Sequence, residues 1–100
     1  MRTQIITLKH GFQVGGQKLV DIVMREPVVA DMMAAERMAG NGGNIAFRSA
    51  LIATCIEKVD GFDAPVSLNM IGELKLADYN LLVDGLSELE EEGEAEAKKE

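Results

Sequence analysis

Apolar and polar side chains alternate over residues 3–14, and the alternation returns over residues 18–24. A period of two is typical of a β-strand that buries one face. Gly11 lies inside the first stretch and indicates a bulge or bend there. The residues predicted to share the inner face of the first strand are Ile6, Leu8, His10, Phe12 and Val14.

The two strands are separated by Gly15-Gly16. Both glycines can adopt a positive φ, as a tight two-residue hairpin turn requires. The sequence therefore predicts a β-hairpin over residues 3–25, with Val20, Ile22 and Met24 on one face of its second strand. An isolated hairpin is only marginally stable in water, so other elements must cover it.

The apolar positions after the hairpin recur at helical spacing. They predict helices at about 28–39, 45–58, 68–74 and 77–89. Gly40 is a natural end for the first helix, and Asn44 and Ser67 are candidate caps for the second and third. The inward stripe of the second helix is predicted to contain Ile45, Ser49, Ile52, Cys55, Ile56 and Val59, and that of the last helix Tyr79, Leu82, Val83, Leu86 and Leu89.

The hairpin is joined to the first helix by the segment R-E-P-V-V-A-D. Pro27 has a fixed φ and no N–H, which suits the first turn of a helix, and it holds Glu26 in extended geometry. Asp31 would then place a negative charge near the positive end of the helix dipole. Arg25 could pair with a nearby carboxylate and fix the hairpin against the helices, or it could contact a partner protein.

Composition is consistent with one small domain of 100 residues, of which 47% are hydrophobic. The net charge is −7, and residues 90–100 carry −4 of it. We therefore expect an α+β fold in a single domain over residues 1–89, with an N-terminal β-hairpin packed on a small bundle of three to four helices. Residues 90–100 are expected to form an acidic C-terminal tail that is disordered or a fraying helix.

The charge distribution and hydropathy also limit the partners and the compartment. The chain has no cluster of Lys and Arg, which argues against direct binding to nucleic acid. No apolar run is long enough to span a membrane, and no secretory signal opens the chain. We therefore expect a cytoplasmic protein with neither nucleic-acid nor membrane partners.

The sequence contains no recognisable set of catalytic residues. Cys55 is the only cysteine and lies in an apolar run, so a buried, inert thiol is expected rather than a nucleophile. His10 is the only histidine and is expected to be packed or at a strand edge, and no residues show the spacing of metal ligands. We expect neither enzymatic activity nor a cofactor.

Six methionines are unusual in so short a chain. Several of them, including Met24 and Met70, could simply fill the core. However, helix 28–39 is apolar on more than one face, and a small domain cannot bury all of it. Met is flexible and recurs on adaptable binding surfaces. The candidate partner-binding residues are Arg25, Met32, Met33, Glu36 and Met38.

The order and spacing of these segments resemble the small tail assembly chaperones of long-tailed bacteriophages and Mu-like prophages. The hairpin reads L-x-x-G-x-x-V-G-G-x-x-L, R-E-P follows with an acid four residues after the proline, and L-x-x-A-D-Y-x-x-L comes last. The resemblance covers roughly residues 4–90. Its matching residues are Leu8, Gly11, Val14, Gly15, Arg25, Glu26, Pro27, Asp31, Ala34, Ala35, Glu36, Leu51, Ile52, Ala53, Cys55, Leu74, Asp78, Tyr79 and Leu82. Where some relatives carry an acid early in the second helix, this chain has Ala46-Phe47-Arg48.

The resemblance implies a non-enzymatic assembly factor. Such proteins bind the phage tape measure protein, help to recruit tail tube subunits and are absent from the mature virion; a homo-oligomer is left open. Gly15, Gly16, Pro27, Asp31, Asp78 and Tyr79 would be structural motif residues. The resemblance also implies a programmed frameshift, and Ala97-Lys98-Lys99 can be encoded by a run of bases suited to slippage.

Two other classes of function remain open from the residues. A small acidic regulator or inhibitor, such as an antitoxin-like protein or a DNA mimic, would carry its acids on a folded face, whereas here they are expected in a tail. A small enzyme subunit would need a polar pocket that the sequence does not indicate.

Overall fold

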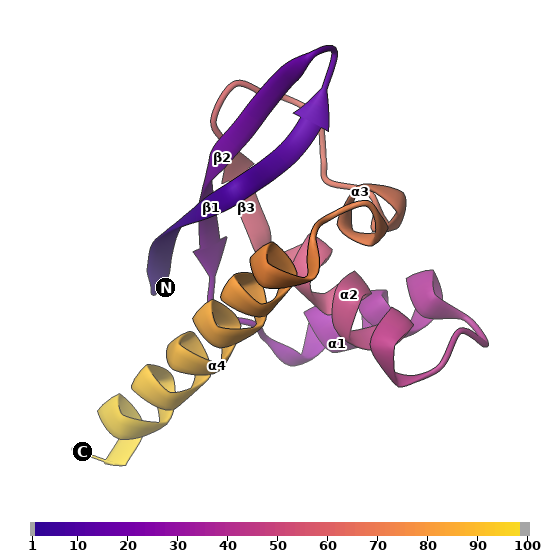
Figure 1. Cartoon of the computed structure of the whole chain (residues 1–100). Helices are drawn as coiled ribbons and strands as arrows, with labels where there is room; N and C mark the ends of the chain where they lie inside the picture. The colour runs from indigo at the N-terminus through magenta and orange to yellow at the C-terminus, as the bar shows by residue number, and fades with distance from the viewer. Residues whose placement is uncertain (1, 99–100) are drawn as a thin grey trace.

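The computed structural model describes residues 2–98, with side chains described for residues 2–94. The predicted N-terminal hairpin is present: β1 (Thr3–Val14) and β2 (Gln17–Arg25) run antiparallel. Gly15 and Gly16 both have positive φ, 56° and 80°, and Val14 pairs with Gln17 on either side of them. The predicted two-residue turn is therefore confirmed, and it lies at the tip of the hairpin in Figure 1.

A third strand, β3 (Ile56–Val59), joins the sheet beside β2, and the sequence did not predict it. The expected helix 45–58 was wrong over residues 56–58, because α2 ends at Cys55 and the chain becomes extended at once. Ile56 and Val59 continue the helical spacing of the preceding residues, which explains the error. They are also β-branched, and pairing with Met24 and Ile22 on β2 decides in favour of a strand.

Four helices complete the α+β fold: α1 (Val29–Ala39), α2 (Asn44–Cys55), α3 (Leu68–Gly72) and α4 (Leu76–Lys98). Two expected helix starts need correction. Pro27 lies before the N-cap residue Val28, and therefore outside the first turn of α1. Gly43, not Asn44, is the N-cap of α2, and no side chain caps that helix. Ser67 does cap α3, since its hydroxyl accepts from the Met70 N–H.

The acidic C-terminal segment is helical in the described chain. Of the two expected states from residue 90, disorder or a fraying helix, the structure has the helix, since α4 continues to Lys98. Its acidic side chains contact the start of β1: Gln4 donates to Glu88 over 2.8 Å, and Arg2 forms an ion pair with Glu92 over 3.4 Å. These contacts across the ends of the chain could not be read from local sequence. Lys99, part of the expected slippage site, lies outside the described residues.

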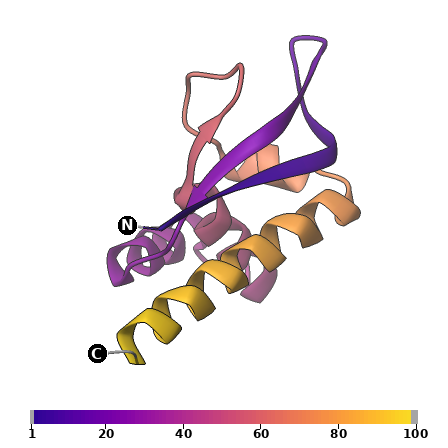
Figure 2. The same cartoon turned by 90° about the vertical axis from the view of Figure 1, so that its left-hand side faces the viewer.

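The core forms where α4 crosses one face of the sheet (Figures 1 and 2). Gly85 permits close approach, because a Cβ at this position would come within 2.2 Å of the Ile6 side chain. Ile45, predicted to point inward, is 77% exposed, since the first turn of α2 extends beyond the core. The buried apolar residues are Ile6, Leu8, Phe12, Leu19, Ile22, Met24, Ala35, Ala50, Leu51, Ile52, Ala53, Cys55, Val59, Val66, Ile71, Leu82, Leu86 and Leu89.

Helix α1 lies at the edge of the fold and has α2 as its main neighbour. In Figure 1 it lies behind α2, well away from the hairpin tip. Only Asp31 and Ala35 of this helix are buried. Within the described residues, no helix combines the length and apolar composition needed to cross a membrane.

Candidate interaction surface

Asp78, in the first turn of α4, is fully buried and binds the backbone of β1. Its carboxylate accepts hydrogen bonds from the N–H groups of Lys9 (2.7 Å), His10 (2.9 Å) and Gly11 (2.8 Å). Consecutive N–H groups that converge on one carboxylate require an irregular backbone. The start of α4 therefore holds a bulge in β1.

Burial of Asp78 would by itself raise the pKa of its carboxyl group, but the three backbone N–H groups outweigh burial. The pKa of Asp78 consequently lies below its ordinary value. The carboxylate stays ionised and is satisfied entirely by the protein. This arrangement is typical of a structural carboxylate.

The bulge explains why His10 is not where the alternation placed it. The register between β1 and β2 shifts between Thr7 and Phe12, and Gly11 has a φ of 76°. Ile6, Leu8 and Phe12 point inward as predicted, whereas His10 is exposed. Its expected position on the inner face was wrong, because the bulge changes the alternation at this point.

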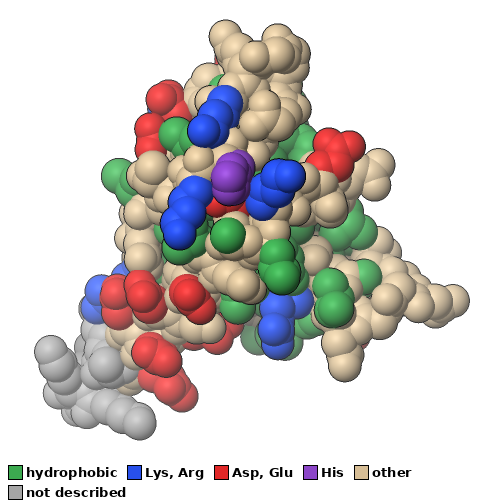
Figure 3. Space-filling view, in the orientation of Figure 1, with side chains coloured by type: hydrophobic (Ala, Val, Ile, Leu, Met, Phe, Trp, Pro, Cys, Tyr) green, Lys and Arg blue, Asp and Glu red, His purple; other side chains and the backbone are tan. Residues whose placement is uncertain are grey.

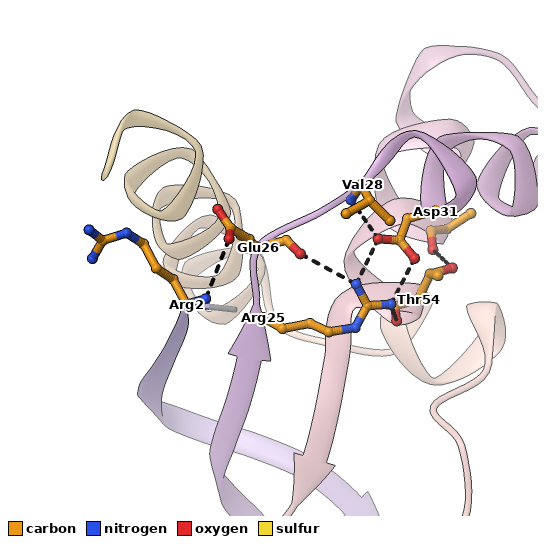
Figure 4. Close-up of polar contacts among 7 residues, drawn as sticks. Arg2, Arg25, Glu26, Val28, Asp31 and Thr54 are labelled. Atoms are coloured by element: carbon orange, nitrogen blue, oxygen red, sulfur yellow. Dashed lines mark hydrogen bonds and ion pairs between the residues drawn. The ribbon is translucent and has the colours of Figure 1, made fainter. Parts of the chain in front are cut away.

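A second carboxylate, Asp31, forms an ion pair with Arg25, and this pair connects three elements at the other end of the sheet (Figure 4). Arg25, at the end of β2, donates two hydrogen bonds of 2.7 Å each to Asp31 in the first turn of α1. The guanidinium group also donates to the Thr54 carbonyl near the end of α2, over 3.2 Å. The Asp31 carboxylate also accepts a hydrogen bond from the Val28 N–H over 2.8 Å.

The hydrogen bonds with Arg25 lower the pKa of Asp31 and raise that of Arg25. The predicted ion pair between hairpin and helix is therefore present. Since Arg25 uses its donors within the chain, the geometry favours this structural interpretation over a contact with a partner.

The remaining motif residue, Tyr79, also bonds within the protein. Its hydroxyl group lies 3.1 Å from the Ser49 hydroxyl group on α2. Cys55 is buried, and burial raises the pKa of its thiol to about 11. The expected burial of the thiol is confirmed. In the part of the chain that the structure describes, no group of His, Cys, Asp and Glu side chains is arranged to hold a metal ion.

The three methionines of α1 are exposed: Met32 by 48%, Met33 by 57% and Met38 by 42%. They do not share one side of the helix, because each points about 100–140° from the other two at 3.6 residues per turn. Met32 and Met33 flank Val29, which is 70% exposed. Met38 lies on another side, with its sulfur 3.6 Å from the Thr54 hydroxyl group.

Glu36 is exposed on the same side of α1 as Val29 and Met32. We call Val29, Met32, Met33 and Glu36 the α1 surface. Sequence analysis identified three of its four residues as candidates and missed Val29.

Comparison with protein families gives a match over residues 5–91 to the family described as "Phage tail assembly chaperone proteins, E, or 41 or 14". The chain belongs to the phage tail assembly chaperone family. The match covers almost the same residues as the resemblance seen in the sequence. Comparisons with curated proteins and with solved structures give no match.

Family membership supports a role in phage tail assembly and suggests a function without catalysis. The two buried carboxylates of this tail assembly chaperone, Asp31 and Asp78, both hold elements of its fold together. Asp78 holds together segments that are 67 or more residues apart in the sequence, and Asp31 joins the end of β2 to the first turn of α1. Sequence analysis identified Asp78 as a motif residue, but it could not show that the carboxylate binds the backbone of β1.

Proposed function

We propose that this chain is a non-enzymatic chaperone that binds the phage tape measure protein and helps to recruit tail tube subunits. It acts in the cytoplasm of the bacterial host and is absent from the mature virion. The observation that supports binding is the α1 surface, where a helix at the edge of the fold exposes large apolar side chains.

The spacing of the α1 surface suits a helical partner. Val29, Met32 and Met33 have the i, i+3, i+4 spacing that places side chains on one stripe of a helix. Such a stripe packs well against the apolar stripe of another helix, and flexible Met side chains adapt to changing partner residues along a long protein. The tape measure protein is the long helical protein expected in this setting.

The anchoring of α1 suits binding as well. The ion pair between Arg25 and Asp31 fixes the first turn of α1, so the exposed stripe is already positioned before a partner binds. A pre-positioned surface loses less conformational entropy on binding than a disordered one.

Charging the α1 surface is expected to weaken binding. Met33→Glu should reduce the amount of tape measure protein that co-purifies with the chaperone by about tenfold, because a buried unpaired charge in an interface costs more than 1 kcal/mol. The melting temperature should change little, since Met33 is 57% exposed. Co-expression followed by affinity purification measures the first quantity, and circular dichroism the second.

Ile5→Glu is the matched control. Ile5 is 71% exposed on β1, far from α1 in the sequence, so this variant adds the same charge at an exposed apolar position elsewhere. It should co-purify the tape measure protein normally. Normal binding by Met33→Glu, or an equal loss in Ile5→Glu, would contradict the assignment of the α1 surface.

The competing interpretation as an acidic regulator has to be weighed again. We expected the acids in a C-terminal tail, but Glu88, Glu90, Glu91, Glu92 and Glu94 are exposed on the folded helix α4. The position of these acids therefore no longer distinguishes an acidic regulator from an assembly chaperone. Family membership does, and it favours the assembly chaperone.

The proposed longer product of frameshifting is tested by the gene sequence. Tandem slippage needs a run of identical bases at codons 97–99, which the residues Ala97-Lys98-Lys99 permit. We expect such a run, followed by an open −1 frame. A different base sequence there, or a −1 frame that closes within a few codons, would place any slippage elsewhere.

A further inference from the structure

A second apolar surface lies where α2, α3 and the start of α4 meet. A groove of about 440 Å³ is lined mainly by apolar side chains, including Ile71, Leu74 and Tyr79. Ile45 and Leu76, at its rim, are 77% and 73% exposed, which makes them the most exposed large apolar side chains of the described chain. We call this the α2–α4 groove.

The α2–α4 groove is separate from the α1 surface. Ile45, Arg48 and Ser49 of α2 line the groove. Thr54, which contacts Met38 of α1, points about 140–180° away from Ile45 and Ser49 around the axis of α2. The two apolar surfaces therefore lie on different sides of α2, and one helix cannot cover both.

The charge around the groove is positive, although the whole chain carries −7. Arg48 is the only charged residue that lines it. Lys75 is exposed between Leu74 and Leu76, and Lys9 is exposed on β1 next to the backbone that Asp78 binds. Figure 3 shows Lys and Arg side chains near hydrophobic ones on this face; the largest group of Asp and Glu lies at the lower left, along α4, and further acidic side chains lie at the upper left and upper right.

The start of α2 adds to this positive potential. No side chain caps the helix and its first turn contains no acidic residue, so neither a cap nor a first-turn acid compensates the positive end of its dipole. Glu73, next in sequence to Gly72 and Leu74, lines an adjoining hollow and not the groove itself. An acidic side chain at the groove would meet both Arg48 and the positive end of α2.

The acidic second half of α4 does not suit the groove. The negative charge of this helix is concentrated at residues 88–94, but none of the exposed large apolar side chains lies between residues 77 and 94. An occupant must supply apolar side chains and acids together.

We propose that the α2–α4 groove is a second docking site, and that it binds an amphipathic helix of a partner protein whose apolar stripe is flanked by Asp or Glu. The apolar stripe covers Ile45 and Leu76, and the acids approach Arg48 and Lys75. With the α1 surface on another side of α2, the chaperone can hold two helical partners at once.

Two synthetic amphipathic helices test this docking site. They share one Leu stripe, which is flanked by Glu in the first peptide and by Lys in the second. Fluorescence anisotropy with the full chain should give a dissociation constant about tenfold lower for the Glu peptide, because opposite charges across an interface favour one partner and like charges disfavour the other. Arg48→Glu should reverse this preference.

Surface variants locate the binding. Leu76→Glu should raise the dissociation constant of the Glu peptide about tenfold, as loss of a central apolar contact does. Ile5→Glu, which adds the same charge at an exposed apolar position on β1 outside both surfaces, should leave it unchanged. Circular dichroism should show a native fold for all three variants, since Leu76, Ile5 and Arg48 are exposed.

Three outcomes would overturn the proposal. The two peptides could bind equally well, or Met33→Glu could abolish binding while Leu76→Glu does not. Finally, sedimentation could show a dimer of the wild-type chain that Leu76→Glu converts to a monomer, which would make a second copy the occupant. None of these results depends on the tape measure protein, so the proposed function of the α1 surface is tested separately.

Discussion

Replacing Asp78 with alanine is expected to lower the free energy of unfolding by about 3–5 kcal/mol, because buried donors left without an acceptor cost roughly 1–3 kcal/mol each. The carboxylate is the acceptor for the N–H groups of Lys9, His10 and Gly11, and Asp78 is fully buried. Small domains are stable by only about 5–15 kcal/mol, so the variant should be close to unfolding at ambient temperature. Urea denaturation followed by circular dichroism measures the loss.

Asp78→Asn separates the role of the charge from that of the shape. The amide keeps one acceptor oxygen, but its NH2 group faces backbone donors, so we expect a loss of about 2–4 kcal/mol. Asp84→Asn is the control, since Asp84 is exposed on the same helix and should change stability by less than about 0.5 kcal/mol. Equal effects at positions 78 and 84 would show that the hydrogen bonds to β1 contribute little.

The pH dependence of stability follows from the same carboxylate. The pKa of Asp78 is lower in the folded chain than its ordinary value of about 3.9, which approximates the unfolded chain. Its contribution is therefore complete above that pH and is lost as the pH falls through the folded pKa. Asp31 has a lowered pKa as well and acts in the same direction. The free energy of unfolding of Asp78→Asn should consequently fall less steeply with decreasing pH than that of the wild-type chain.

The hairpin could be predicted because its signals are local. Alternation fixes the strands, and Gly15-Gly16 fixes the turn between them. The third strand could not, because Ile56 and Val59 fit a helix and a strand equally well until β2 is present to pair with them. The extent of α4 was missed for a related reason, since contacts with Arg2 and Gln4 lie at the far end of the sequence.

The candidate sites show the same division between local and distant information. The pairing of Arg25 with Asp31 was one of the expected possibilities, because the two residues are close in sequence. The exposure of Met32 and Met33 followed from an apolar helix in a domain too small to bury it. The contact between Asp78 and the β1 backbone spans 67 residues or more, and no spacing rule indicates it. The α2–α4 groove was also missed, because Ile45 fitted the inward stripe of a helix whose first turn extends past the core.

Gly11→Ala is expected to destabilise the chain by about 2–5 kcal/mol, which combines roughly 1–2 kcal/mol for a left-handed backbone with an overpacking cost of about 1–3 kcal/mol. Gly11 has a φ of 76°, and a Cβ there would lie 2.4 Å from the Leu19 carbonyl oxygen and 2.9 Å from the carbonyl carbon. Backbone atoms of a paired strand cannot move aside as a flexible side chain can. Relief would require β1 to leave the bulge and lose hydrogen bonds to Asp78.

Gly15→Ala provides the matched comparison for this prediction. Gly15 also has a positive φ, 56°, but a Cβ there would meet nothing within 4 Å. Both substitutions remove the same conformational freedom from the unfolded chain, so this contribution cancels when they are compared. Gly15→Ala should cost only about 1–2 kcal/mol, the strain of the left-handed backbone. Denaturation midpoints that fall equally in the two variants would show that the bulge tolerates a side chain. In that case the close approach of Gly11 to Leu19 would not be what fixes this irregular part of β1.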